Sequence, residues 1–335
     1  MPADSKLQRL FVNTNWANLI QPSIYNSSSS RISNNLPALQ FLDGDAQFNV
    51  VNKAIDILME TITVPDRKQL KALEWSLNEV TDNVLNHAES QIGGILQIQC
   101  FPNRNEVSFY VVDAGLGVPA TLRKSLPQLT SDSEALDRAI REGVTRNSST
   151  NQGNGLFGAF KCCEVSNGVF NVRSNHASLN YKRGEFAVSR ENVPFRGSFI
   201  SGTINYSTSE LLEKALVFKG KIHEPSYDYI DIHYTHIGEK TIFRFCDEVE
   251  GFGSREYGRR AKLRIDNILV DKKNSIILDF SGAPIVSSNF ADEVLGKLFV
   301  GMGPMEFVRR CEFRNVDPTV RRLIDRAIAQ RMKTG

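Results

Sequence analysis

Side chains that suit a nucleotide and a metal ion occur in three segments, and the first segment carries two of them four residues apart. Glu79 and Asn83 lie in a run whose apolar residues recur every three or four positions, so both project from one flank of a predicted helix. The amide oxygen of Asn83 suits Mg²⁺, which takes a few protein oxygens together with water and phosphate. Glu79 can accept a proton from water or a hydroxyl group. Asn86 extends this polar row by three positions.

The second segment has the sequence DAGLG and follows directly on a predicted strand. Asp113 opens it, where its carboxylate can accept a hydrogen bond from an exocyclic amine. Gly115 and Gly117 allow the chain to turn sharply and predict room for a flat ring. A flat ring with an exocyclic amine fits this description.

The third segment has the sequence GNGLFG and leads into a predicted helix over residues 156–164. Gly153 and Gly155 precede that helix, and Leu156 and Gly158 lie in its first turn. Backbone N–H groups at a helix start bind anions. The segment therefore predicts a site for the phosphates of a nucleotide.

The elements that must position these segments form an α/β pattern. We expect helices over residues 48–61 and 67–88, and the second has a core-facing stripe at Leu70, Leu73, Leu77, Val80 and Val84. A hairpin is predicted from two strands, residues 95–101 and 106–112. Residues 118–151 are polar, contain one predicted helix at 133–141, and are long enough for a lid. The pattern continues with predicted strands at residues 169–173, 178–182 and 198–206.

The remaining sequence predicts a second, smaller α/β domain. Its expected strands are residues 230–236, 241–245 and 275–280, and its expected helices are residues 255–269, 290–300 and 318–332. We therefore divide the chain into an arm at 1–47, a main domain at 48–206, a linker at 207–229 and a C-terminal domain at 230–335.

Composition excludes several classes of protein. The chain has 335 residues and a net charge of +2, so no strong field of one sign favours nucleic acid or an anionic membrane. The cysteines are scattered and lack the spacing of a zinc site. No apolar run reaches the length of about 18 residues that a membrane helix needs. We expect a soluble, cytoplasmic protein whose partner is another protein or a second copy of itself.

The order of the three segments resembles the GHKL family, the ATPases of gyrase, histidine kinases and MutL, whose fold is named after Bergerat. The resemblance covers about residues 66–206, and the stretch NEVTDNVLNHA is most similar to the anti-sigma-factor serine kinases. It implies a two-layer α/β sandwich with a mostly antiparallel sheet and helices on one face. It also implies ATP and Mg²⁺ as ligands.

The resemblance assigns a role to each residue of the site. Glu79 would be the general base, Asn83 would bind Mg²⁺ with Asn86 beside it, and Asp113 would bind adenine. Thr203, in the pair Gly202-Thr203, would support the adenine. The remaining residues would shape the pocket and lid: Gly115, Gly117, Gly153, Gly155, Leu156 and Gly158.

The C-terminal stretch LDFSGAPIVSSNFADEVLGKL is similar to the STAS domains of anti-sigma-factor antagonists, and more similar to the STAS-like domains fused to such ATPases in bacteria. The resemblance spans about residues 230–329. Ser287 and Ser288 stand where the antagonists are phosphorylated. Val286, however, replaces the Asp that normally precedes the serine, so both serines can equally be helix N-caps.

Two functional hypotheses follow. The first is an enzyme, either a slow ATPase or a serine-kinase-like regulator that acts by partner switching with its STAS-like domain. The second is a nucleotide-gated binding module, in which ATP changes the surface offered to a partner without significant turnover. The resemblance to such fused proteins adds the hypothesis of a role in a bacterial stress or defence system.

Overall fold

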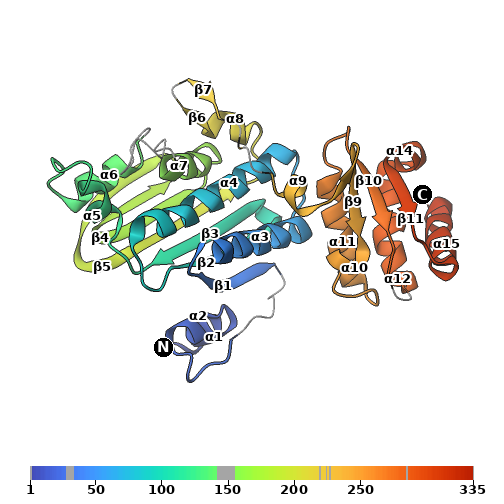
Figure 1. Ribbon diagram of the computed structural model, residues 1–335, viewed down its shortest axis with the longest axis horizontal. Coiled ribbons are helices and arrows are strands. Elements are labelled where there is room, and N and C mark those ends of the chain that lie inside the picture. Colours follow the sequence, from blue (N-terminus) through green and yellow to red (C-terminus); the bar gives the residue numbers. More distant parts are fainter. Residues whose placement is uncertain are drawn as a thin grey trace. The chain divides into compact units, whose positions relative to one another are not determined.

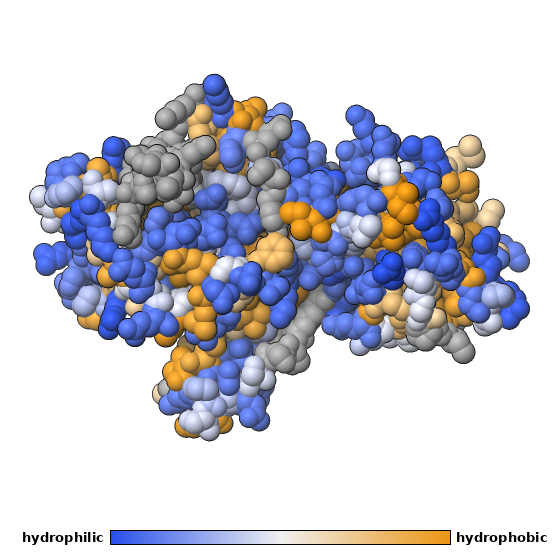
Figure 2. Space-filling model, in the orientation of Figure 1, coloured by the Kyte–Doolittle hydropathy of each residue, from blue (hydrophilic) through white to orange (hydrophobic). Residues whose placement is uncertain are grey.

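The computed structural model of the chain describes residues 2–27, 34–141, 155–218, 220–223, 225, 228–283 and 286–334. The chain forms two compact units, each built from two stretches of sequence. Unit 1 comprises Met1–Ile57 and Lys68–Tyr227, and unit 2 comprises Leu58–Arg67 and Asp228–Gly335. No helix among the described residues is long and apolar enough to cross a bilayer. Apolar residues are scattered among hydrophilic ones on the face drawn in Figure 2.

Unit 1 is built on a five-stranded sheet in the order β1-β2-β3-β5-β4, and every neighbouring pair is antiparallel. Its strands are β1 (Asn35–Phe41), β2 (Gly94–Phe101), β3 (Glu106–Asp113), β4 (Val169–Lys182) and β5 (Glu185–Asn205). Side chains alternate between the two faces of a strand. In β3 this alternation buries Val107, Phe109 and Val111, and Asp113 follows on the same face. A small hairpin, β6 (Val217–Phe218) with β7 (Lys221–Ile222), lies outside the sheet.

Helices complete unit 1, and α3 and α4 cross one face of its sheet (Figure 1). The helices are α1 (Ser5–Asn13), α2 (Trp16–Ile20), α3 (Gly44–Thr61), α4 (Arg67–Asn83), α5 (Val118–Arg123), α6 (Asp132–Ala139), α7 (Gly155–Val165) and α8 (Leu211–Ala215). The stripe predicted for α4 is buried at Leu70, Leu73, Leu77 and Val80. The mixed α/β architecture with an antiparallel sheet is thereby confirmed.

The N-terminal residues include a strand that the sequence pattern did not predict. The segment before β1 is bound to the sheet by three hydrogen bonds: Ala38 N donates to Thr14 O (2.9 Å), Asn15 Nδ2 donates to Ala38 O (2.8 Å), and Trp16 Nε1 donates to Gln97 Oε1 (2.6 Å). Residues 35–41 thus extend the sheet by β1, because pairing with β2 outweighs the weak local signal.

Close packing of α7 on α4 depends on a glycine. A Cβ atom at Gly158 would lie 2.2 Å from Cη2 of Trp75. The Trp75 ring is only 8% exposed, and its centroid lies 6.2 Å from those of both Phe218 and His223. The ring therefore has little room to move away.

We expect Gly158→Ala to lower the free energy of unfolding of unit 1 by about 1–3 kcal/mol, the usual range for overpacking. Both tryptophans, Trp16 and Trp75, lie in unit 1, so urea denaturation followed by tryptophan fluorescence reports on that unit. Gly44→Ala is the control, since no described heavy atom lies within 4 Å of its added Cβ. A loss as large in the control would contradict the packing argument.

Unit 2 contains a four-stranded sheet in the order β11-β10-β9-β8. Its strands are β8 (His236–Ile237), β9 (Lys240–Arg244), β10 (Ser275–Asp279) and β11 (Cys311–Arg314). The last three are parallel, and only the β8–β9 pair is antiparallel among the described strands of this sheet. The helices are α9 (Tyr229–His233), α10 (Phe245–Glu248), α11 (Arg255–Ile268), α12 (Ser288–Ala291), α13 (Lys297–Met302), α14 (Pro304–Arg310) and α15 (Pro318–Thr334), with a π turn, η3 (Asp292–Gly296), between α12 and α13.

The strand predicted at residues 230–236 is wrong, because most of that run forms α9. The side chain of Asp228 accepts a hydrogen bond from Ile230 N and so caps the helix. The Tyr229 and His233 rings, one helical turn apart, stack with centroids 4.8 Å apart. These local contacts outweigh the strand preference of the apolar run.

Candidate functional site

Glu79 and Asn83 lie one turn apart on α4, as the sequence predicted. Directly after Asn83 the helix continues as a π turn, η1 (Val84–Ala88). Single π turns of this kind are frequent at functional sites. Asn86 lies in this turn, whose i→i+5 bonding is wider than that of an α-helix, and it is exposed. Its position relative to Glu79 and Asn83 therefore differs from the one that continuous α-helical spacing predicts.

The carboxyl group of Glu79 has an unusual proton affinity. Glu79 is half-buried, and burial together with the nearby Asp82 carboxylate raises its pKa from 4.5 to about 7. A carboxylate with such a pKa is suited to proton transfer near neutrality.

The start of α7 lies directly against this carboxyl group. A Cβ atom at Gly155 would be 2.2 Å from Glu79 Oε2, so a larger residue there would displace the end of the Glu79 side chain. Gly158 fills a different role, because it accommodates Trp75. Leu156 packs against a cluster formed by Leu122, Leu129, Ala135 and Ala139. Gly153 lies outside the described residues.

Asp113 ends β3 and is only 4% exposed. Its Oδ1 accepts a hydrogen bond from Gly115 N (2.8 Å), and Ser198 donates from both its side chain and its backbone. Burial raises the pKa of Asp113 above its ordinary value, although these hydrogen bonds oppose the shift. The group is a fixed acceptor at the end of a buried strand.

The glycines after Asp113 serve the packing of the chain itself. A Cβ atom at Gly115 would lie 2.0 Å from the carbonyl oxygen of Ala88, at the end of η1. Leu116 N donates to that same oxygen (2.7 Å). Gly117 has φ +82°, and its Cβ would meet Asn175 and Ser174. A side chain larger than hydrogen at either position would therefore collide with neighbouring atoms, which explains both glycines.

Thr203 does not lie beside Asp113. In the register of β3 and β5, Thr203 is paired with Ser108, and the two hydroxyl groups lie 2.8 Å apart. Ser108 and Asp113 are on opposite faces of β3, because successive side chains alternate. Ser198, which is paired with Asp113, occupies the place that was assigned to Thr203. The sequence GSF at residues 197–199 was the signal that could have identified it.

Two contacts join these segments around α4 and η1. Glu79 touches the start of α7, and Ala88 binds the loop after Asp113. No cluster of three or more His, Cys, Asp or Glu that could hold a metal occurs in the described part of the chain. A Mg²⁺ ion does not need such a cluster, since it is usually bound by one or two protein oxygens plus phosphate and water. The Asn83 amide, for which no hydrogen bond to another described residue is found, offers one such oxygen.

The two serines of the C-terminal unit differ in their surroundings. Ser287 caps α12: its hydroxyl oxygen accepts from Phe290 N (3.1 Å), and its own N–H donates to Phe252 O (3.0 Å). Ser288 is exposed in the first turn. Val286 before them is buried, with 2% exposure.

Comparison with protein families gives a match to a STAS-like domain of unknown function (DUF4325) over residues 257–321. The matched segment begins within α11 and ends within α15. The STAS-like character predicted for the C-terminal region is therefore confirmed over this segment. A search of curated proteins finds none that matches the chain.

Proposed function

We propose that this chain is a Mg²⁺-dependent ATP-binding protein of the GHKL type that hydrolyses ATP slowly. The observation that carries the proposal is the Glu79 carboxyl group, which has a pKa of about 7 and lies against the first residue of α7. A helix start attracts phosphate, and a carboxylate beside it is where a base must lie to deprotonate a water molecule attacking the terminal phosphate.

The other residues have separate tasks in this proposal. Asp113 accepts a hydrogen bond from the 6-amino group of adenine. The N–H groups at the start of α7 bind the phosphates. Asn83 supplies an oxygen for Mg²⁺, whose charge offsets that of the phosphates.

In the reaction, Glu79 takes a proton from water as the water oxygen bonds to the γ-phosphorus. The bond from phosphorus to the bridging oxygen breaks, and the products are ADP and inorganic phosphate. Water is the favoured acceptor over the serines of the STAS-like region, because Val286 replaces the Asp that normally precedes the phosphorylated serine and the Ser287 hydroxyl is engaged as a helix cap. The low net charge of +2 favours a protein, or a second copy of the chain, as the regulated partner.

Incubation of the full chain with γ-labelled ATP and Mg²⁺ tests the proposal. We expect labelled phosphate in solution and no label on the protein. Label retained on Ser287 or Ser288, and lost in serine-to-alanine variants, would instead identify a serine kinase. Tight binding with neither product would identify a nucleotide-gated module. Absence of binding would remove the proposal altogether.

Asn83→Ala tests the metal assignment. We expect the affinity for ATP measured with Mg²⁺ to fall by about tenfold, the lower end of the loss seen when a metal site is weakened. Binding measured in EDTA should change little, because the lost oxygen acts through the metal. The melting temperature without nucleotide should stay the same, since Asn83 is only half-buried. Unchanged calorimetric affinity for Mg·ATP would contradict the assignment.

A further inference from the structure

The segment Leu58–Arg67 connects α3 to α4 but belongs to unit 2. It comprises the last turn of α3, a short stretch without regular structure, and the first residue of α4. The helix that carries Glu79 and Asn83 therefore starts from a residue of the unit that contains the STAS-like region.

Asn267 of α11 binds the first half of this segment. Its Nδ2 donates to Met59 O (3.0 Å) and Ile62 O (2.7 Å), and its Oδ1 accepts from Val64 N (3.1 Å). Carbonyl groups at the end of a helix lack partners within the helix, and Asn267 supplies them for α3. The side chain is only 1% exposed, so water cannot replace these bonds.

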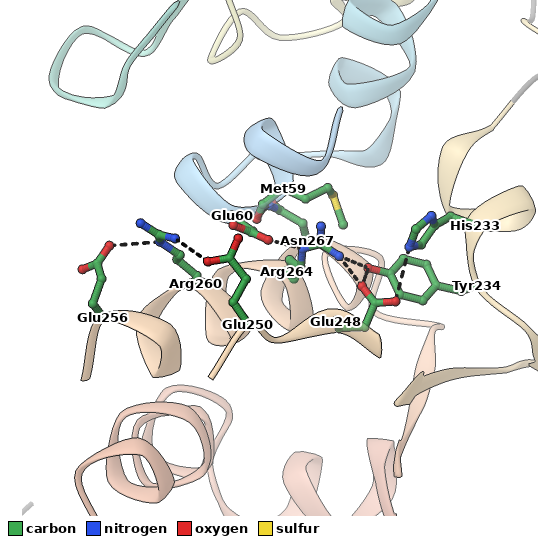
Figure 3. A network of polar contacts seen from close by, with 10 residues as sticks. All are labelled: Met59, Glu60, His233, Tyr234, Glu248, Glu250, Glu256, Arg260, Arg264 and Asn267. Atoms are coloured by element: carbon green, nitrogen blue, oxygen red, sulfur yellow. Dashed lines mark hydrogen bonds and ion pairs between the residues drawn. The ribbon is translucent and has the colours of Figure 1, made fainter. Parts of the chain in front are cut away.

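Arg264, one turn earlier on α11, binds the same segment through an ion pair. Its Nε lies 2.9 Å from Glu60 Oε1, and both side chains are nearly buried, with 6% and 12% exposure. The same guanidinium group pairs with Glu248 and the hydroxyl group of Tyr234 (Figure 3). Burial alone would raise the pKa of Glu248, but the hydrogen bond from His233 and the charge of Arg264 hold it below its ordinary value. Glu248 is therefore favoured as a carboxylate, which pairs with Arg264.

Arg67 fixes the other end of the segment. Its Nη2 lies 2.8 Å from Asp228 Oδ1 and 2.6 Å from Asp231 Oδ1. Asp228 in turn caps α9. Residues of α9 and α11 thus bind the connection at both of its ends, and the start of α4 is fixed with it.

We propose that Asn267 is a positioning residue for the nucleotide site, which it sets by fixing the connection from which α4 begins. The inference rests on the proposed function for its kinetic consequence. Glu79 lies twelve residues, or about 18 Å of helix, beyond Arg67. If the start of α4 samples several positions, a smaller fraction of the molecules is competent to bind ATP. The apparent dissociation constant for ATP then rises in inverse proportion to that fraction. The chemical step in correctly bound molecules is unaffected.

The test is Asn267→Ala in the full chain, with steady-state hydrolysis of Mg·ATP as the readout. We expect KM to rise by about tenfold, as for a competent fraction reduced to about one tenth, with kcat within about twofold. The matched control is Asn274→Ala, which removes a similar amide bond to the carbonyl of Ile268 in α11 and does not bind Leu58–Arg67. A lower melting temperature with unchanged KM would show a purely structural role and overturn the inference.

Asp231→Asn is the second variant, because Asn267→Ala leaves buried polar groups without partners and reduces stability. Asp231 is 61% exposed, so its neutralisation leaves no buried charge unpaired and removes only one of the two ion pairs of Arg67. The same rise in KM is expected in smaller degree. Hydrogen exchange of the amides in the first turns of α4, measured without nucleotide, tests the positioning role separately from the proposed ATP binding. Faster exchange in both variants supports positioning even if the wild type binds no ATP, whereas unchanged exchange overturns it.

Discussion

Replacing Glu79 by alanine is expected to lower the rate of phosphate release by about 10²–10⁴-fold, the usual contribution of a general base. Binding of Mg·ADP, measured by calorimetry, should stay within about threefold of the wild type, because the lost group acts on the attacking water rather than on the bound nucleotide. Hydrolysis at the wild-type rate in this variant would exclude Glu79 as the base.

The pH dependence of the reaction gives an independent check on the same residue. The base must be ionised, so kcat/KM of the wild type should rise with pH through about 7, the pKa of Glu79. Asp82→Asn is the matched control. The Asp82 charge raises the pKa of Glu79, so its removal should move the rise to lower pH and leave the rate at high pH unchanged. If kcat/KM of this variant rises at the same pH as that of the wild type, a group other than Glu79 titrates.

The elements around the candidate site could be predicted where the signal is local. The stripe from Leu70 to Val80 predicted α4 because its members are buried, although the structure also buries residues between them, such as Glu74 and Ser76. The alternation that ends at Asp113 predicted β3 for the same reason. A single helix or strand carries its own period, and chain neighbours suffice to reveal it.

Side-chain direction in longer elements could not be predicted in the same way. Side chains an odd number of positions apart point to opposite faces of a strand, so Thr203, five positions after Ser198, lies on the other face of β5. The register of β5 follows from its pairing with β3 and from irregularities opposite Asn175 in β4, which involve distant residues. The exposed position of Asn86 depends likewise on a π turn that no residue type announces.

The binding of Asn267 to the segment Leu58–Arg67 could not be predicted from the sequence for a related reason. Asn267 lies about 200 positions along the chain from its partners, with separations of 203 to 208 residues. A buried asparagine in a helix has no sequence pattern that names its partner. Only the three-dimensional fold brings these residues together.

The Asp113 carboxylate offers the sharpest test of base selectivity. In Asp113→Asn the amide oxygen can still accept from Gly115 N, and the Ser198 hydroxyl can rotate to accept from the new NH₂ group. The other carboxylate oxygen, however, is replaced by an NH₂ group, which is a donor and not an acceptor. A donor facing the 6-amino group of adenine leaves two polar groups unpaired.

We therefore expect Asp113→Asn to weaken ATP binding by about 10- to 100-fold, the equivalent of one or two unpaired groups. GTP, which has a carbonyl oxygen at position 6, should bind the variant no more weakly than it binds the wild type, because that oxygen can accept from the amide. Thr203→Val is the control: it removes the hydrogen bond to Ser108 on the opposite face of the sheet and should change neither affinity. An equal loss for both nucleotides in Asp113→Asn would indicate damage to the fold, and a selective loss of ATP in Thr203→Val would mean that the adenine lies on the other face of the sheet.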